Sequence, residues 1–194
     1  MNRCFGDGDP LYEAYHDEEW GFPVTDERGL FERLCLEGFQ SGLAWITILR
    51  KRPAFREAFA DFEPDAVARF GAEDVERLMG DAGIVRNRAK IAATIANARA
   101  TVDLRDGGTP LEVLVWSHRP RARKAVKRLG DLPAQTSEAT ALAKELKRAG
   151  FRFVGPTTVY AAMQACGLVN DHIASCPVRP AAEAAQSALA PPTG

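Results

Sequence analysis

Apolar residues recur every three or four positions along most of the chain, which is the period of an amphipathic helix. The clearest pattern extends from Asp26 to about Phe39, and its acidic start is favourable at a helix N-terminus. A longer pattern extends from Arg86 to Leu104 and ends at a pair of glycines. Shorter helices are predicted at 43–51, 53–59, 72–79, 137–148 and 156–166, and directly after Pro64 and Pro110.

Glycine and proline mark the predicted ends of these helices. Gly38 and Gly42 predict a bend between two helices over residues 37–45, and Pro53 predicts a break before another helix. Residues 151–154 are the one candidate strand, so the predicted fold class is all-α. From Arg179 the chain is rich in alanine and proline without periodicity. We therefore predict one helical domain over residues 1–178 and a disordered tail over 179–194.

Composition narrows the function. The 194 residues carry a net charge of -1, so a surface for nucleic acid would have to come from a local cluster of basic residues. The densest cluster lies between Arg119 and Arg128, and it fits either a DNA backbone or a solvated face. The sequence shows no secretion signal and no apolar run near the length of a membrane span. We expect a cytoplasmic, monomeric protein without membrane contact.

Cysteine and histidine pairs lie near both ends of the chain, as Cys4 with His16 and His172 with Cys176. Two thiolates and two imidazoles suit tetrahedral Zn²⁺. The spacing of the N-terminal pair is not diagnostic, and the alternative is that these are unconnected thiols with surface or capping histidines. Four protein ligands would leave no position for water, so a zinc ion held in this way would be structural.

Four segments, in this order along the chain, carry a resemblance to a known family. They are DPLYEAYHDEEWG at 9–21, LEGFQSGLAW at 36–45, DAGIVRNRAKI at 81–91, and a stretch from FVG at 153–155 to MQACGLVNDH at 163–172. Together they resemble the DNA-3-methyladenine glycosylase I family, from Arg3 to about Cys176. The resemblance implies a helix-hairpin-helix glycosylase fold. It also implies an enzyme of base excision repair that flips 3-methyladenine out of alkylated double-stranded DNA and hydrolyses its N-glycosidic bond.

The resemblance also implies residue roles. It identifies Glu37 as the acid that recognises the base. The ligands that it implies for a structural Zn²⁺ joining the two ends of the domain are Cys4, His16, His172 and Cys176. The family usually has a tryptophan directly after the first cysteine, whereas this chain has Phe5 followed by Gly6. Either Phe5 replaces that ring or the pocket wall differs here.

The residue types around Glu37 suit this chemistry. A 3-methylated adenine is cationic in DNA and leaves readily, so the enzyme needs recognition and electrostatic stabilisation more than a strong acid. Glu37 would accept hydrogen bonds from the exocyclic amine and favour the charged base over a neutral one. The rings expected to stack on the flipped base are those of Tyr12, Tyr15, Trp20 and Trp45. Without this context, Glu37 would be interpreted as a solvated helix residue and the rings as core.

The bend after Glu37 is expected to contact DNA. Gln40, Gly42 and Leu43 would fill the gap that the flipped base leaves in the duplex. No lysine in the four segments is placed as a Schiff-base nucleophile. We therefore expect a monofunctional enzyme that does not cleave the strand.

A second DNA contact is expected at the hairpin before the long helix. Gly83 permits a tight turn there, and backbone N–H groups near a helix N-terminus can hold a phosphate. Arg86, Arg88 and Lys90 would add positive charge beside it.

Two other classes of function remain open at this stage. A non-catalytic helix-hairpin-helix DNA-binding module with a structural zinc would keep the hairpin, but it would have no need of Glu37 among aromatic rings. A zinc hydrolase would need an open metal position, which four protein ligands do not leave.

Overall fold

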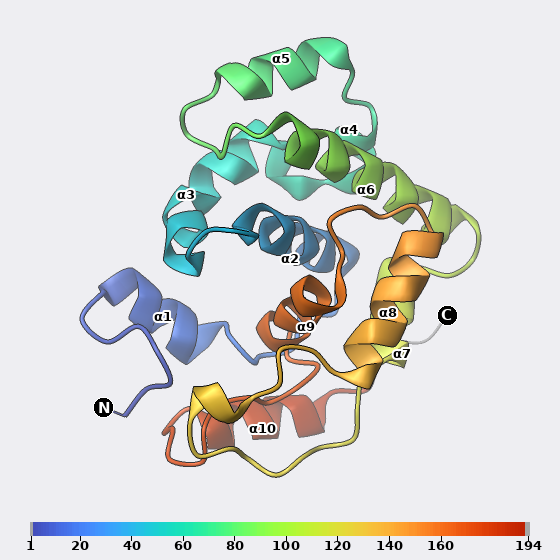
Figure 1. Ribbon diagram of the computed structural model, residues 1–194. Helices are drawn as coiled ribbons and strands as arrows, with labels where there is room; N and C mark the ends of the chain where they lie inside the picture. The colour runs from blue at the N-terminus through green and yellow to red at the C-terminus, as the bar shows by residue number, and fades with distance from the viewer. Residues whose placement is uncertain (1, 193–194) are drawn as a thin grey trace.

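The structure is a computed structural model that describes residues 2–192, and within that range the backbone forms helices and no strand. The all-α prediction is therefore confirmed. Figure 1 shows α2 near the middle, with α3, α4 and α6 on one side of it and α9 and α10 on the other. The elements are α1 (Pro10–Glu18), α2 (Glu27–Gln40), α3 (Trp45–Ala58), η1 (Ala60–Phe62), α4 (Pro64–Ala68), α5 (Ala72–Gly80), α6 (Arg88–Asp106), α7 (Leu111–Ser117), η2 (Leu129–Asp131), α8 (Ser137–Arg148), α9 (Pro156–Ala165) and α10 (Arg179–Ala188).

Helix α2 is the centre of the fold. It begins where the Asp26 side chain accepts a hydrogen bond from the Gly29 N–H at 2.8 Å, which satisfies one of the free donors at a helix start. Every residue from 30 to 39 is buried, because α3, α6, α7 and α9 all pack against this helix. A polar side chain on α2 must therefore find either a partner or a cavity.

A cluster of phenylalanines fixes the position of α3 against α2. Phe39, Phe55, Phe59 and Phe62 are fully buried, and the ring centroids of Phe39 and Phe55 lie 4.6 Å apart. Burying each such side chain stabilises the fold by roughly 1.5–3 kcal/mol. This packing holds the turn of residues 41–44 between the two helices in place.

Two segments near the N-terminus are more helical than their patterns predict. Helix α1 occupies a stretch for which the periodicity predicted no helix. It begins because the Asp9 side chain accepts from the backbone N–H groups of Leu11 and Tyr12. Helix α3 continues through Pro53, where a break was predicted. Phe55 and Ala58 beyond the proline are buried, and this packing offsets the backbone hydrogen bond that proline cannot donate.

Two predictions near the C-terminus are wrong. Residues 151–154 form no strand, and Phe153 has a left-handed backbone with φ of 55°. Residues 179–188, expected to be disordered, form α10, so the helical region continues beyond 178. This helix docks through buried Ala182 and through Gln186, whose Nε2 donates to the Gly21 carbonyl at 2.7 Å. Residues 193–194 of the predicted tail lie outside the described residues.

None of the helices within residues 2–192 combines the length and the apolar character that crossing a lipid bilayer requires.

Candidate active site

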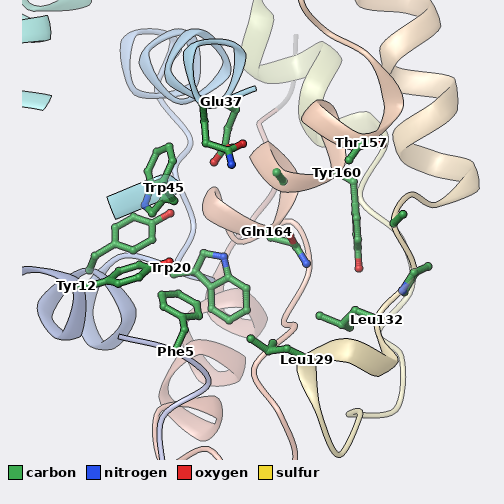
Figure 2. Close-up of a pocket in the computed structure, with 15 residues that line it drawn as sticks. Phe5, Tyr12, Trp20, Glu37, Trp45, Leu129, Leu132, Thr157, Tyr160 and Gln164 are labelled. Atoms are coloured by element: carbon green, nitrogen blue, oxygen red, sulfur yellow. The ribbon is translucent and has the colours of Figure 1, made fainter. Parts of the chain in front are cut away.

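A cavity of about 380 Å³ opens between α1, α2, the start of α3, α9 and the segment around η2 (Figure 2). A space of this size, with many rings and few polar groups, is typical of a site for a small molecule. Its lining consists of Phe5, Tyr12, Tyr15, Trp20, Glu37, Gln40, Trp45, Leu129, Leu132, Pro133, Ala134, Thr157, Tyr160, Ala161 and Gln164.

Glu37 faces this cavity from the interior of α2 (Figure 2). The sequence placed it at the edge of a bend, but α2 continues past Gly38 to Gln40, so the carboxyl group is held on a rigid helix. Glu37 is only 6% exposed. Burial raises the pKa of its carboxyl group to about 8, although the positive charge of Arg33 acts to lower it. No donor from residues 2–192 forms a hydrogen bond with the carboxyl group. A cation that entered the cavity would therefore favour its ionised form.

The positive charge closest to Glu37 along α2 already has a partner. Arg33 donates from Nη2 to the Glu19 carboxylate at 2.5 Å, and Arg52 donates to the same carboxylate at 2.6 and 2.7 Å. Burial by itself would raise the pKa of Glu19, but hydrogen bonds and charge from Arg52 and Arg33 lower it to about 2. Nη2 of Arg33 thus pairs with Glu19, and within residues 2–192 neither Nη1 nor Nη2 donates a hydrogen bond to Glu37.

Aromatic rings form the wall beside Glu37. The four rings named from the sequence all line the cavity, with the Tyr15 and Trp45 centroids 5.3 Å apart. Phe5 stands in the same wall, 4.9 Å from Tyr12 and 5.0 Å from Trp20 between ring centroids. The ring that replaces the expected tryptophan is therefore part of the pocket. Flat, electron-rich faces of this kind attract a planar cation.

The two cysteines and two histidines from the ends of the chain meet beside this wall, and their possible ligand atoms all lie within 4.8 Å of one another. Cys176 Sγ lies 3.3 Å from His172 Nδ1 and 3.6 Å from His16 Nε2, and Cys4 Sγ lies 3.6 Å from His172 Nδ1. Tetrahedral Zn²⁺ with sulfur and nitrogen ligands needs about 3.5 Å between such atoms. The group could therefore bind a metal ion.

Second contacts orient both imidazoles. His16 Nδ1 lies 2.7 Å from Asp17 Oδ1, and His172 Nε2 lies 2.9 Å from the Trp20 carbonyl, so the other nitrogen of each ring faces the cluster. Burial lowers the pKa of His172 to about 4, which keeps it in the neutral form that binds metals. Phe5 directly follows a ligand in the chain and Trp20 packs 4.7 Å from the His172 ring. The cluster thus supports the aromatic wall.

Sequence reasoning missed the opposite wall of the cavity. It consists of Thr157, Tyr160 and Gln164 of α9 together with Leu129 and Leu132 around η2. Gln164 lies in one of the segments that carried the family resemblance, so a signal existed for it. Thr157 and Tyr160 lie in the same stretch, between its two quoted motifs, whereas Leu129 and Leu132 lie outside all four segments and reach the pocket only through the chain's path.

The turn after α2 is exposed as expected for a DNA contact. Leu43 is 39% exposed, an unusual position for a large apolar side chain. Gly42 has φ of 84°, which a residue with a side chain rarely adopts. The Gln40 amide donates to the Leu43 carbonyl at 2.7 Å and closes the turn.

The hairpin before α6 differs in detail from its prediction. Gly83 lacks the left-handed backbone of a tight glycine turn; instead, a Cβ there would lie 2.9 Å from the Cβ of Ala54. Its N–H donates to Asp81 at 2.7 Å and is not free for a phosphate. Arg86 is exposed, while Arg88, also exposed, pairs with a glutamate of α5 at 2.7 Å.

Lys90 lies in a different environment from the one predicted. It is buried, and its ammonium group donates to the carbonyls of Phe39 at 2.9 Å and Ser41 at 2.7 Å. The last carbonyls of a helix lack intrahelical partners, so the ammonium group satisfies acceptors at the end of α2. Lys90 therefore fixes the start of the exposed turn and does not face solvent as a phosphate contact would.

The basic segment 119–128, for which the sequence allowed either a DNA backbone contact or a solvated face, is only partly available to solvent. Arg119 donates to the Gln186 carbonyl at 2.8 Å, and Arg123 donates to Asp171 at 2.7 Å, so both hold structure together. The exposed remainder is Arg121, Lys124, Lys127 and Arg128.

Comparisons with known proteins show the family of the chain. The family model described as methyladenine glycosylase matches residues 5–180. DNA-3-methyladenine glycosylase 1 of Escherichia coli (strain K12) is 52% identical over 180 residues, which cover 91% of this chain and 96% of that protein. A crystal structure of 3-methyladenine DNA glycosylase I has a TM-score of 0.88 at 49% identity, covering 90% of this chain and 98% of that one. A structure of a 3-methyladenine DNA glycosylase I variant in complex with 3-methyladenine has a TM-score of 0.87 at 39% identity, and the match covers 93% of this chain and 98% of that one. The chain therefore belongs to the methyladenine glycosylase family.

Proposed function

We propose that this protein removes 3-methyladenine from alkylated double-stranded DNA by hydrolysing the N-glycosidic bond. The observation that carries the proposal is the buried Glu37 carboxyl group, which faces a ring-lined cavity and has no hydrogen-bonded partner within residues 2–192. The similar protein crystallised with 3-methyladenine supports the choice of base.

Selection of the charged base follows from electrostatics. A cationic base in the cavity would lower the pKa of Glu37 from about 8 and form an ion pair in a poorly hydrated site. A neutral adenine offers no such compensation for ionising a buried carboxyl group. The rings of Tyr12, Tyr15, Trp20 and Trp45 would hold the plane of the base, and stacking of this kind is worth roughly 1–3 kcal/mol.

The bond-breaking step does not require a strong acid, because the leaving base is already cationic. The bond between C1′ and the base breaks, its electron pair neutralises the cationic base, and the sugar becomes an oxocarbenium-like cation. Water then attacks C1′ and releases a proton to solvent. No lysine lines the cavity within residues 2–192, and Lys90 already donates to two carbonyls, so no amine is placed to form a Schiff base. This supports a monofunctional enzyme.

The DNA surface would lie along the exposed turn and the hairpin. Leu43, presented by Gln40 and Gly42, would enter the gap left by the flipped base. Arg86 and Arg88 would contact the backbone, where each neutralised phosphate releases counter-ions.

Zn²⁺ is the metal that we propose for the cluster of two cysteines and two histidines. The donor set, its burial and the separations near 3.5 Å fit a closed tetrahedral shell. When bound, the ion would supply folding free energy and take no part in the reaction. This proposal leaves the zinc hydrolase interpretation without support, because protein atoms would take all four positions of such a shell.

Release of free 3-methyladenine from alkylated duplex DNA tests the proposal. We expect Glu37→Gln to lower the single-turnover rate by about 100-fold or more, the scale of removing a group that stabilises developing charge. The matched control is Glu32→Gln, a buried carboxylate on the same helix that pairs with Arg56 at 2.9 Å outside the cavity. That variant should keep the rate. Unchanged turnover in Glu37→Gln, or no release by the wild-type protein, would contradict the proposal.

A further inference from the structure

The wall opposite the aromatic rings contains a second buried carboxylate, that of Asp171, whose side chain is 2% exposed. It accepts from the Tyr160 hydroxyl at 2.5 Å, from Gln164 Nε2 at 2.8 Å and from Arg123 Nη2 at 2.7 and 2.8 Å. Arg123 Nη2 also contacts the Tyr160 hydroxyl oxygen. Three donors thus converge on one carboxylate, and two of them belong to residues that line the cavity.

This network fixes which way the Gln164 amide points. An amide has one donor end and one acceptor end, and an ionised carboxylate can only accept. The Asp171 carboxylate therefore selects the orientation in which Gln164 presents its NH₂ group to the network. The Gln164 amide oxygen takes no part in this network, and no donor within residues 2–192 forms a hydrogen bond with it. Figure 2 shows Gln164 reaching into the cavity between Glu37 and Leu129.

Two acceptors consequently belong to residues that line the same cavity from different walls: the carboxyl group of Glu37 and the amide oxygen of Gln164. An exocyclic amine carries two hydrogens and can satisfy two acceptors. A carbonyl at the same position of a purine carries none, so it cannot donate to the Gln164 oxygen, whereas a protonated Glu37 can still donate to it. A site built around a hydrogen bond rejects the analogue that lacks the partner group far more strongly than an apolar site does.

We propose that Gln164 is a specificity-determining residue of the pocket, which accepts a hydrogen bond from the 6-amino group of the methylated purine, and that Asp171 is the positioning residue that holds its amide in that orientation. The inference rests on the proposed function, because it assigns a second contact to the same flipped base. It predicts discrimination between purines with an amine and purines with a carbonyl at position 6.

The test compares the binding of two free bases, 3-methyladenine and 3-methylhypoxanthine, which differ in the group at position 6. We expect Gln164→Met to bind 3-methyladenine about tenfold more weakly and to leave binding of 3-methylhypoxanthine within about twofold, since one hydrogen bond is worth about this factor. Gln135→Met, an exposed glutamine outside the cavity, is the matched control. An equal loss for both bases, or no loss, overturns the assignment.

The variant Asp171→Asn provides a second test, with the same two free bases. An asparagine can accept or donate, so the Gln164 amide would be free to turn and offer its NH₂ group to a carbonyl. We expect binding of 3-methylhypoxanthine to improve by about threefold while 3-methyladenine binds more weakly, a crossed change that simple loss of structure does not produce. Weaker binding of both bases would overturn the positioning role. Release of 3-methyladenine by the wild-type protein, measured in parallel, separates failure of this inference from failure of the proposed function.

Discussion

Two buried carboxylates near the cavity differ in their partners: Glu37 lines it, and Asp171 lies behind the lining residues Tyr160 and Gln164. Glu37 and Asp171 are 6% and 3% exposed, so burial alone does not distinguish them. Asp171 accepts hydrogen bonds from a hydroxyl, an amide and a guanidinium group, whereas Glu37 has no such donor and its pKa rises to about 8. A satisfied buried carboxylate holds a structure together, and an unsatisfied one is a site for a ligand that brings the missing charge.

The difference arises from where the nearby arginines are committed. On the Asp171 wall, Arg123 from the basic segment crosses to α9 and supplies a positive charge. On the Glu37 wall, Arg33 is one helical turn away, yet Glu19 takes its hydrogen bond. The comparison predicts that the Asp171 carboxylate stabilises the fold and that the Glu37 carboxylate destabilises it.

Loss of the metal cluster should have the largest effect, because it supports both the aromatic wall and the loop that carries Asp171. We expect Cys176→Ser to lower the free energy of unfolding by several kcal/mol, a large part of the roughly 10 kcal/mol that a structural zinc can supply. Denaturant unfolding and metal content of freshly purified protein measure this. Cys35→Ala, a buried thiol of α2 outside the cluster, should cost only about 1 kcal/mol. Equal losses, with much less than one zinc per chain in the wild type, would refute the metal assignment.

Removing the satisfied carboxylate should have the next largest effect. Asp171→Ala would leave the Arg123 guanidinium, the Tyr160 hydroxyl and the Gln164 amide without their shared acceptor. We expect a loss of about 3 kcal/mol in the free energy of unfolding at pH 7, measured with urea. A loss below about 0.5 kcal/mol would show that Asp171 is not the centre of that wall.

Neutralising the unsatisfied carboxylate should have the smallest effect and the opposite sign. The pKa of Glu37 is about 8 in the fold against an ordinary value of 4.5, so the wild type loses stability as the pH rises from 4.5 to about 8. Glu37→Gln avoids that cost, and we expect it to be more stable than the wild type by about 1–3 kcal/mol at pH 7, since one pKa unit corresponds to about 1.4 kcal/mol. The gain should shrink toward pH 4.5 and level off above about pH 8. Destabilisation by Glu37→Gln across the range would mean that Glu37 has a partner in solution.

Periodicity in the sequence was sufficient for the long helices, because the apolar residues of α2 and α6 recur at the helical period and pack into the core. Periodicity failed for a helix that is stabilised by packing against the rest of the fold and has no clear apolar pattern of its own. The Ala-rich segment of α10 has little apolar surface, yet Ala182 and Gln186 are buried against the rest of the fold. In the same way, Lys90 resembled a surface charge in the sequence and is an interior cap on α2.

Periodicity was enough to predict the helical class. Residue types within recognisable segments were enough to predict the family, the candidate acid Glu37, the rings beside it and the four candidate metal ligands. Which of these side chains keep an unmatched charge depends on the folded chain. That property depends on neighbours distant in the chain: Glu19 for Arg33, and Arg123 for Asp171. Hydrogen bonds act over about 3 Å of space whatever the separation in sequence, so no local pattern can reveal them.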